Sequence, residues 1–240
     1  MSLEGWLYLS LHLIIQINPG DTMEQGLIID QFDELRALYS GLTLEKTDGV
    51  WNIQGQLIFI ASFAEQIIED EYSIHLVVPE SYPDCVPVAY EIGNRIPRHF
   101  HKYKDGNLCL GEPLAVWKTF SEHPTLLGFV QNNLVPYLYS FSYLCRNGRL
   151  PFGELSHGEL GRIEYYQDLF NVRSEHSLFG LIAILAQGEY RGHIQCPCGS
   201  KQRLRLCHGP QVLEIMRSAP PGYFKSLYQY MSQRGLAYFR

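Results

Sequence analysis

The chain has 240 residues, of which 46% are hydrophobic and 18% are charged. This composition excludes an intrinsically disordered chain, because it can bury a substantial core, and the length suggests one or two domains. The formal net charge of −6 argues against a nucleic-acid partner, since contacts to phosphates need a basic surface.

Residues 1–26 are interpreted as an N-terminal extension, and their longest apolar run covers residues 6–17. A run of about a dozen residues is too short to span a bilayer, which takes about 20 residues of helix. The run also lacks the basic segment and the small-residue cleavage site of a signal peptide. We therefore expect a cytoplasmic protein with no membrane partner. The pattern does not decide between a strand and a helix for residues 1–20.

The next segments indicate an α+β fold. Over residues 27–40, apolar side chains recur at spacings of four, three and four residues, which predicts a helix. Apolar and polar residues alternate over 51–59 and 72–78, which predicts two strands, and a third strand is expected at about 86–92. A helix followed by an antiparallel meander is typical of an α+β fold rather than of alternating βαβ units.

Residues 96–117 show no sustained periodicity, and irregular stretches of this length in compact domains are usually functional. A cysteine thiolate is a good nucleophile, and acyl transfer also needs donors that meet the oxyanion of the tetrahedral intermediate. The local pattern leaves open whether the cysteine is a nucleophile or a small buried hydrophobe. The stretch contains four candidate side chains: His99, His101, Tyr103 and Cys109.

Helices are expected in the rest of the chain. One begins after Pro124 and is interrupted at Pro136, because proline cannot donate the backbone hydrogen bond that a helix interior requires. Ser156 and Glu159 form a capping-box pair, which predicts a further helix that extends to about Phe170. The remaining predicted helices lie between Ser174 and Gly188, at 210–217 and at 222–234.

Three of the six cysteines lie close together near the C-terminus, in the pattern Cys-x-Cys-x8-Cys-His. Three thiolates and one imidazole complete the tetrahedral shell of a structural zinc ion, and a closed shell leaves no position for a hydrolytic water. This distribution favours one metal cluster and three isolated thiols over three disulfides. The sequence therefore predicts a structural Zn²⁺ bound by Cys196, Cys198, Cys207 and His208.

The spacing around the isolated cysteine resembles that of the ubiquitin-conjugating (E2-like) family. In that family the histidine of a His-Pro-Asn motif lies ten residues before the catalytic cysteine, as His99 does before Cys109. A Tyr-Pro turn upstream and a tryptophan eight residues downstream, at Trp117, continue the resemblance. The resemblance covers about residues 27–145 and implies a ubiquitin-conjugating-type fold over 27–150, an N-terminal helix and an antiparallel β-meander followed by C-terminal helices.

The resemblance also implies a role for each residue of the stretch. Cys109 corresponds to the cysteine that forms a thioester, and His99 to the histidine that holds the loop. Tyr103 occupies a position that in some members lines the site of the incoming lysine. Phe100 and His101 stand where the family has proline and asparagine. An imidazole can donate a hydrogen bond as the asparagine does, and such an oxyanion donor contributes about 2.7–4 kcal/mol in the transition state.

The function implied is that of a carrier enzyme. It would accept a ubiquitin-like protein on Cys109 from an activating (E1-like) enzyme and transfer it to an amine of an unknown acceptor protein. Divergent proteins of this kind occur in bacterial conjugation operons, some of which serve antiphage defence. Two alternatives stay open: a catalytically inactive binding module, which the missing Pro-Asn pair favours, and a zinc adaptor for which the first domain is only a scaffold.

The C-terminal cysteine pattern resembles the SEC-C motif, including Cys-Gly-Ser after the first ligand pair. The resemblance implies a small zinc module with C-terminal helices at 190–240, and the helices predicted before it form a helical extension at 151–189. This module is too small to fold on core burial alone, so the ion would act as a staple for the helices. An alternative is a docking surface formed by the basic residues Lys201, Arg203 and Arg205.

Overall fold

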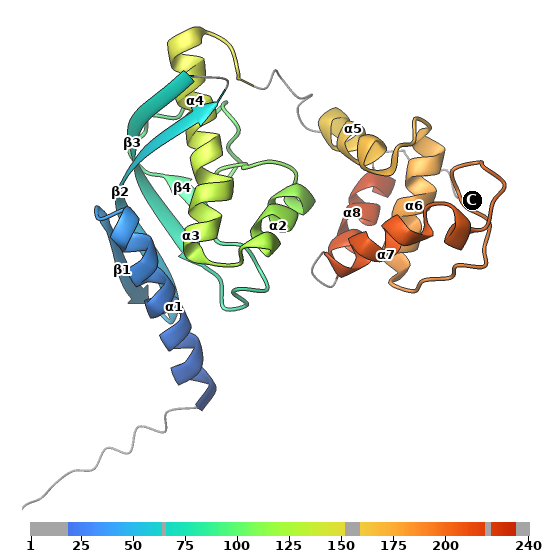
Figure 1. Ribbon diagram of the computed structural model, residues 1–240, viewed down its shortest axis with the longest axis horizontal. Coiled ribbons are helices and arrows are strands. Elements are labelled where there is room, and N and C mark those ends of the chain that lie inside the picture. The colour runs from blue at the N-terminus through green and yellow to red at the C-terminus, as the bar shows by residue number, and fades with distance from the viewer. Residues whose placement is uncertain (1–18, 64–65, 152–158, 219–221, 234–240) are drawn as a thin grey trace, which may run out of the picture.

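A computed structural model describes residues 19–63, 66–151, 159–218 and 222–233. The elements fall into two groups, which we call the N-terminal lobe (residues 19–151) and the C-terminal lobe (residues 159–233) (Figure 1). Each lobe has its own cluster of buried apolar side chains. The interpretation of residues 1–18 lies outside the described residues. Among the described residues, no helix combines the length and hydropathy needed to cross a membrane.

The N-terminal lobe begins with one helix and a four-stranded antiparallel sheet, which confirms the predicted α+β class. Neighbouring strands follow each other in the chain, so the sheet is a simple meander. The predicted helix and strands are all present, although the helix and the two central strands are longer than their patterns indicated. The elements are α1 (Pro19–Leu38), β1 (Leu42–Thr47), β2 (Val50–Phe63), β3 (Gln66–Val78) and β4 (Val88–Glu91).

Strand β1 was not predicted, because only its first residue is fully buried and most of its side chains are exposed. Pairing with β2 defines it, and the two strands meet closely at Gly41 and Gly55. A side chain at Gly55 would place its Cβ 2.0 Å from the Gly41 carbonyl oxygen, and its φ of +142° also favours glycine. Glycine at this position therefore allows the chain that enters β1 to lie close against β2, at the end of the strand pair opposite the turn.

The helices that follow cover the sheet. Helix α4 packs on β2 and β3, and α1 packs on α3. The α-helix is interrupted close to the predicted position at Pro136: a π-helical segment precedes α4, and the proline lies in the first turn of α4, where its missing N–H is tolerated. Helix α2 was also missed, in the last part of the stretch interpreted as irregular. The elements are α2 (Pro113–Glu122), α3 (Leu126–Phe129), η1 (Val130–Leu134) and α4 (Val135–Asn147).

The C-terminal lobe is helical, as predicted. Residues from the predicted extension and from the predicted zinc module share one buried cluster, which also receives Leu114 from α2. Helix α6 is buried over most of its surface and forms the centre of this lobe. Ser156 of the predicted capping box lies outside the described residues. The elements are α5 (Glu159–Phe170), α6 (Glu175–Gln187), η2 (Leu204–Leu206), α7 (Gly209–Arg217) and α8 (Tyr223–Met231).

Candidate functional site

Cys109 lies at the base of a short hairpin formed by residues 101–109, which we call the cysteine hairpin. The backbone N–H of Cys109 donates to the carbonyl oxygen of His101 at 2.7 Å. Nearer the tip, the N–H of Tyr103 donates to the carbonyl of Asn107 at 2.9 Å. The pairing places His101 directly across from Cys109, so two residues predicted from the sequence are brought together. Part of the stretch interpreted as irregular is therefore an ordered hairpin.

The cysteine hairpin is attached to the sheet. The N–H of Leu108 donates to the carbonyl of Ala89 in β4 at 2.7 Å, and Gly106 forms the turn at the tip with a φ of +91°. Non-glycine residues rarely adopt such a φ, so glycine suits this turn. The residue before Cys109 is thus fixed to a strand of the core.

A buried carboxylate anchors the other side of the cysteine hairpin. The Glu91 side chain is fully buried at the end of β4, and one of its oxygens lies 3.3 Å from the ammonium group of Lys102. The backbone N–H groups of Arg95 and Ile96 each donate to the same carboxylate at 3.1 Å. A buried carboxylate is tolerated when it is paired and hydrogen-bonded in this way. Sequence reasoning missed Glu91, because nothing in the sequence reveals its burial.

Tyr137 of α4 holds the first strand of the hairpin from the helical side. Its hydroxyl lies 3.1 Å from the carbonyl oxygen of Phe100 and 3.2 Å from that of His101. Burial raises the pKa of Tyr137, and the charge that Cys109 can carry raises it further, so the hydroxyl stays a donor. Tyr137 was not predicted as a site residue, and its place in an apolar helical pattern gave no signal of this role.

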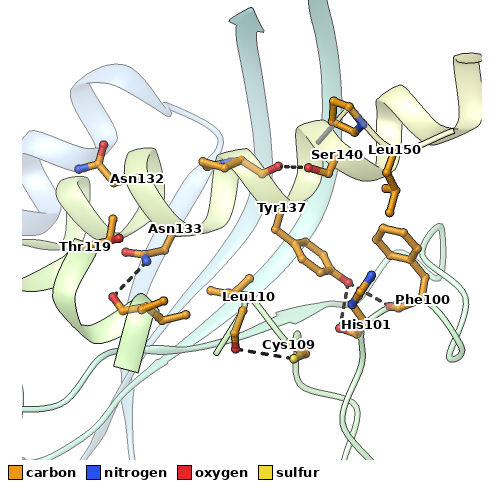
Figure 2. A pocket seen from close by; sticks show the side chains of 15 residues that line it. Phe100, His101, Cys109, Leu110, Thr119, Asn132, Asn133, Tyr137, Ser140 and Leu150 are labelled. Atoms are coloured by element: carbon orange, nitrogen blue, oxygen red, sulfur yellow. Dashed lines mark hydrogen bonds between the residues drawn. The ribbon is translucent and has the colours of Figure 1, made fainter. Parts of the chain in front are cut away.

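Cys109 opens into a cleft of about 320 Å³ between the cysteine hairpin, α2 and α4. Figure 2 shows Cys109 and His101 below Tyr137 on one side of this cleft and Asn133 on the other. The lining is mostly apolar, and Asn133 is one of its few buried polar residues. Its amide nitrogen donates to the carbonyl of Val116 at 3.2 Å, and its amide oxygen is buried without a hydrogen-bond partner among the described residues. The cleft therefore has a mostly apolar lining and one buried acceptor on the side opposite the thiol.

The two other predicted site residues do not line this cleft. Tyr103 is partly exposed and lines a smaller cavity of about 180 Å³ on the opposite side of the cysteine hairpin. Burial of its hydroxyl and then its interaction with the Cys109 thiol raise the pKa of Tyr103. His99 is exposed and lines neither cavity. The predicted role of His99 in holding the loop stays a prediction. Tyr137, through its hydroxyl, makes contacts with the loop backbone of the kind that was expected of His99.

The thiol of Cys109 has one further neighbour. Its Sγ lies 3.9 Å from the carbonyl oxygen of Gly111, within reach of a weak S–H hydrogen bond. Gly111 has a φ of +141°, a backbone conformation that favours glycine. The position of the segment after the cysteine therefore affects the surroundings of the thiol.

The predicted metal ligands do come together in the C-terminal lobe. The ligand atoms of Cys196, Cys198, Cys207 and His208 all lie within 4.8 Å of one another. Four ligands at about 2.0–2.3 Å from one ion require such a span. The cluster could therefore hold a metal ion such as zinc.

The surroundings of the histidine fit a metal ligand. Nε2 of His208 lies 2.9 Å from the carbonyl oxygen of Phe170, which can only accept, so this nitrogen carries the proton. Nδ1 is then free to bind a metal and lies 3.2 Å from both the Cys196 and the Cys207 sulfur. Metal-bound histidines usually donate their second N–H to a carbonyl or carboxylate. The donor set, its spacing and this orientation all suit a closed site.

The thiols of the cluster differ in acidity. Burial raises the pKa of Cys196 to about 11. Partial burial also raises the pKa of Cys198, but hydrogen bonds from Ser200 outweigh it and bring that pKa to about 6. A cation is the natural partner for a cluster in which one sulfur already loses its proton near neutral pH.

No protein-family model matches this chain, and no curated protein gives a significant match. What the chain does must therefore be inferred from the chemistry of its residues.

Proposed function

We propose that this chain is a carrier of the ubiquitin-conjugating type, in which Cys109 accepts the C-terminus of a ubiquitin-like protein as a thioester. The observation that carries the proposal is the position of Cys109, at the base of an anchored hairpin and facing an apolar cleft. The order of elements also supports it, because a helix, an antiparallel meander, a cysteine loop and a crossing helix follow one another as the family resemblance implies.

The chemistry needs two acyl transfers. The Cys109 thiolate attacks the thioester carbonyl that joins the modifier to its activating enzyme, and the enzyme's thiolate leaves as the new C–S bond forms. An amine of the acceptor protein then attacks the thioester on Cys109. The Cys109 thiolate leaves, the amine nitrogen loses a proton, and an amide bond results. Each step passes through a tetrahedral oxyanion that hydrogen-bond donors stabilise.

His101 is the proposed oxyanion donor. It lines the same cleft as Cys109 and pairs with it across the hairpin. The positive φ of His101, +39°, belongs to a backbone that Tyr137 holds through a carbonyl hydrogen bond. A donor on a fixed backbone stabilises the oxyanion without reorganising during the reaction. Tyr103, beside the thiol on the other side, is the proposed residue that meets the incoming amine.

The C-terminal cluster is proposed to hold a structural zinc ion, in an arrangement that resembles the SEC-C motif. Three sulfurs and one imidazole nitrogen would fill all four positions around the ion. When bound, the ion would stabilise the lobe and leave no position for substrate. The proposed partners are an activating enzyme, a ubiquitin-like protein and an acceptor protein, as in a bacterial conjugation operon.

The proposal is tested by thioester formation. The full-length chain is incubated with an activating enzyme, a ubiquitin-like protein and ATP, and separated by gel without reductant. A DTT-sensitive adduct is expected with the wild type and with the control Cys85→Ser, and none with Cys109→Ala. Cys109→Ser should give an adduct that resists DTT, because an oxygen ester replaces the thioester. No adduct with an enzyme that charges another carrier would overturn the proposal.

The second candidate is an inactive binding module, and the exposed position of His99 outside the cleft favours it. The rates of alkylation of Cys109, Cys85 and Cys145 discriminate between the two. A nucleophilic Cys109 should react faster than Cys145, although Cys145 is the more exposed thiol. A Cys109 that reacts more slowly than Cys145 would favour the binding module.

A further inference from the structure

Glu112, three residues after Cys109, is held by the other lobe. Its carboxylate accepts from Nε of Arg162 at 3.0 Å and from the hydroxyls of Tyr223 and Tyr166 at 2.9 and 3.3 Å. All three donors belong to the C-terminal lobe, on α5 and α8. The Glu112 side chain is 11% exposed, so these partners replace most of the water around the carboxylate.

The donors form a connected group. The hydroxyls of Tyr166 and Tyr223 lie 2.8 Å apart, and the Arg162 guanidinium lies 4.8 Å from the ring centre of Tyr230. Burial raises the pKa of both Tyr166 and Tyr223, and the charge of Glu112 raises each further, so both hydroxyls keep their protons. The carboxylate therefore meets one cation and two protonated hydroxyls, one of which can also donate to the other, a set that compensates the cost of its burial.

The segment after the cysteine is thus fixed from outside its own lobe. Leu114, two residues further along, is buried in the cluster of the C-terminal lobe. Lys118 and Glu214 add an exposed ion pair at 3.6 Å, and exposed pairs contribute little. The buried contacts of Glu112 and Leu114 accordingly dominate the attachment of this end of α2.

A single residue, Gly111, links the attached Glu112 to the thiol of Cys109. Gly111 precedes Glu112, and its carbonyl oxygen lies 3.9 Å from the Cys109 sulfur. The charges of Arg162 and Glu112 also act on Tyr103, which interacts with the same thiol. Moving Glu112 would therefore displace Gly111, which is a neighbour of the sulfur and lines the cleft.

We propose that Glu112 is a positioning residue for Cys109, through which the C-terminal lobe fixes the Gly111 carbonyl and the exposure of the thiol. The inference rests on the proposed function only in taking Cys109 as the reactive thiol. The C-terminal lobe is then part of the machinery that sets the reactivity of Cys109, rather than an independent attachment.

The experiment measures the alkylation rate of Cys109 by iodoacetamide in the full-length chain with Zn²⁺ present, by mass spectrometry of the peptide that contains Cys109. Losing the buried, charge-assisted hydrogen bonds in Glu112→Ala should make the loop open more often and speed alkylation about tenfold. Glu112→Gln keeps the shape and one of the two acceptor oxygens but loses the charge, so its rate should lie between those of the wild type and Glu112→Ala. The rates of Cys85 and Cys145 in the same samples should not change.

Two matched variants separate positioning from general stability. Tyr223→Phe removes one hydroxyl from Glu112 and should speed alkylation in the same direction as Glu112→Ala, to a smaller extent. Phe224→Leu, at the next residue of α8, weakens the buried cluster and should lower the unfolding midpoint of the C-terminal lobe without changing the Cys109 rate. The proposal is overturned if Glu112→Ala alkylates like the wild type, or if Phe224→Leu speeds alkylation as much as Glu112→Ala does.

Alkylation needs no activating enzyme, so the outcome is independent of the proposed function. If Glu112→Ala speeds alkylation but the wild type forms no thioester, the carrier function fails and the positioning role stands. If the thioester forms and alkylation is unchanged, the positioning role fails alone.

Discussion

The two lobes reach a fixed structure by different means. The N-terminal lobe packs a four-stranded sheet against α4, and side chains such as Leu57, Ile74 and Leu138 are fully buried between them. The C-terminal lobe also has a buried cluster, but between α6 and α7 it contains a long connection with only the short η2 inside it. Within this connection, the three cysteines and His208 lie where a larger domain would place apolar side chains. Core burial suffices for the first lobe, and the second is expected to need an ion.

Metal removal should produce the largest difference in stability between the two lobes. Zinc binding contributes an apparent free energy of about 10–16 kcal/mol in small zinc-binding peptides. In chelator, or in Cys207→Ser, we expect amides of the C-terminal lobe to lose protection from hydrogen exchange while those of β2 and β3 keep it. Hydrogen exchange with mass spectrometry measures both lobes in one sample. Cys145→Ser, which changes an exposed thiol, is the control, and a protected C-terminal lobe in chelator would contradict the idea.

The second largest effect should come from the apolar core of the N-terminal lobe. Leu57 is fully buried, whereas its neighbour Ile58 is 54% exposed on the other face of β2. Leu57→Ala should lower the free energy of unfolding of this lobe by about 2–5 kcal/mol, because it removes buried methyl groups and leaves a cavity. Ile58→Ala should cost far less. Urea unfolding followed by tryptophan fluorescence measures both, and equal losses would contradict the assignment of the buried face.

A smaller, pH-dependent effect is expected at Asp70. Burial raises the pKa of its carboxyl, but hydrogen bonds from Arg95 and Ser142 outweigh this and lower the pKa from 3.8 to about 2. Because the folded pKa lies below the unfolded one, the stabilisation is complete above about pH 4 and is lost as the pH falls towards 2. The shift corresponds to at most about 2 kcal/mol, because solvent screens part of the interaction.

Urea unfolding of the N-terminal lobe at several pH values tests this expectation. Asp70→Asn should be less stable at pH 7 and should lose less stability than the wild type between pH 4 and 2. Asp33→Asn, at an exposed carboxylate, is the matched control and should keep the pH dependence of the wild type. If the unfolding free energy of Asp70→Asn changed with pH in parallel with that of the wild type, Asp70 would not be the cause of the pH dependence.

The smallest effect is expected from a single hydroxyl in α4. Tyr137→Phe removes the donor that meets the carbonyls of Phe100 and His101 and should cost about 1 kcal/mol. Tyr139→Phe removes a similar hydroxyl that meets Gln66 at the far end of the sheet. Both should lower the unfolding free energy by similar amounts, but only Tyr137→Phe should speed amide exchange in the cysteine hairpin. Equal exchange in the two variants would show that Tyr137 does not hold the hairpin.

The sequence predicted the elements whose buried apolar residues all face one core. The strands β2 and β3 and the helix α6 are such cases. Helix α2 was missed because its two buried residues face different cores, Leu114 that of the C-terminal lobe and Phe120 that of the N-terminal lobe. Its apolar positions therefore serve two partners, and no single-face pattern describes them.

The candidate site was predictable only in part, for a similar reason. The cysteine and the metal ligands were found from short spacings along the chain. The hairpin that pairs His101 with Cys109 could not be found in this way, and Tyr137 reaches His101 across 36 residues. Glu91 and Glu112 look like ordinary surface carboxylates in the sequence, because their burial depends on elements that pack on them from elsewhere.

The hydrogen bond between Glu112 and Tyr223 spans 111 residues, so it has a consequence for the newly made chain. Synthesis proceeds from the N-terminus, and domains generally fold as units while they emerge. All strands of the sheet and Cys109 itself leave the ribosome before Tyr223 does. The thiol therefore acquires its final surroundings among the last steps of maturation, and a chain truncated before α8 carries the cysteine without one of the donors to Glu112.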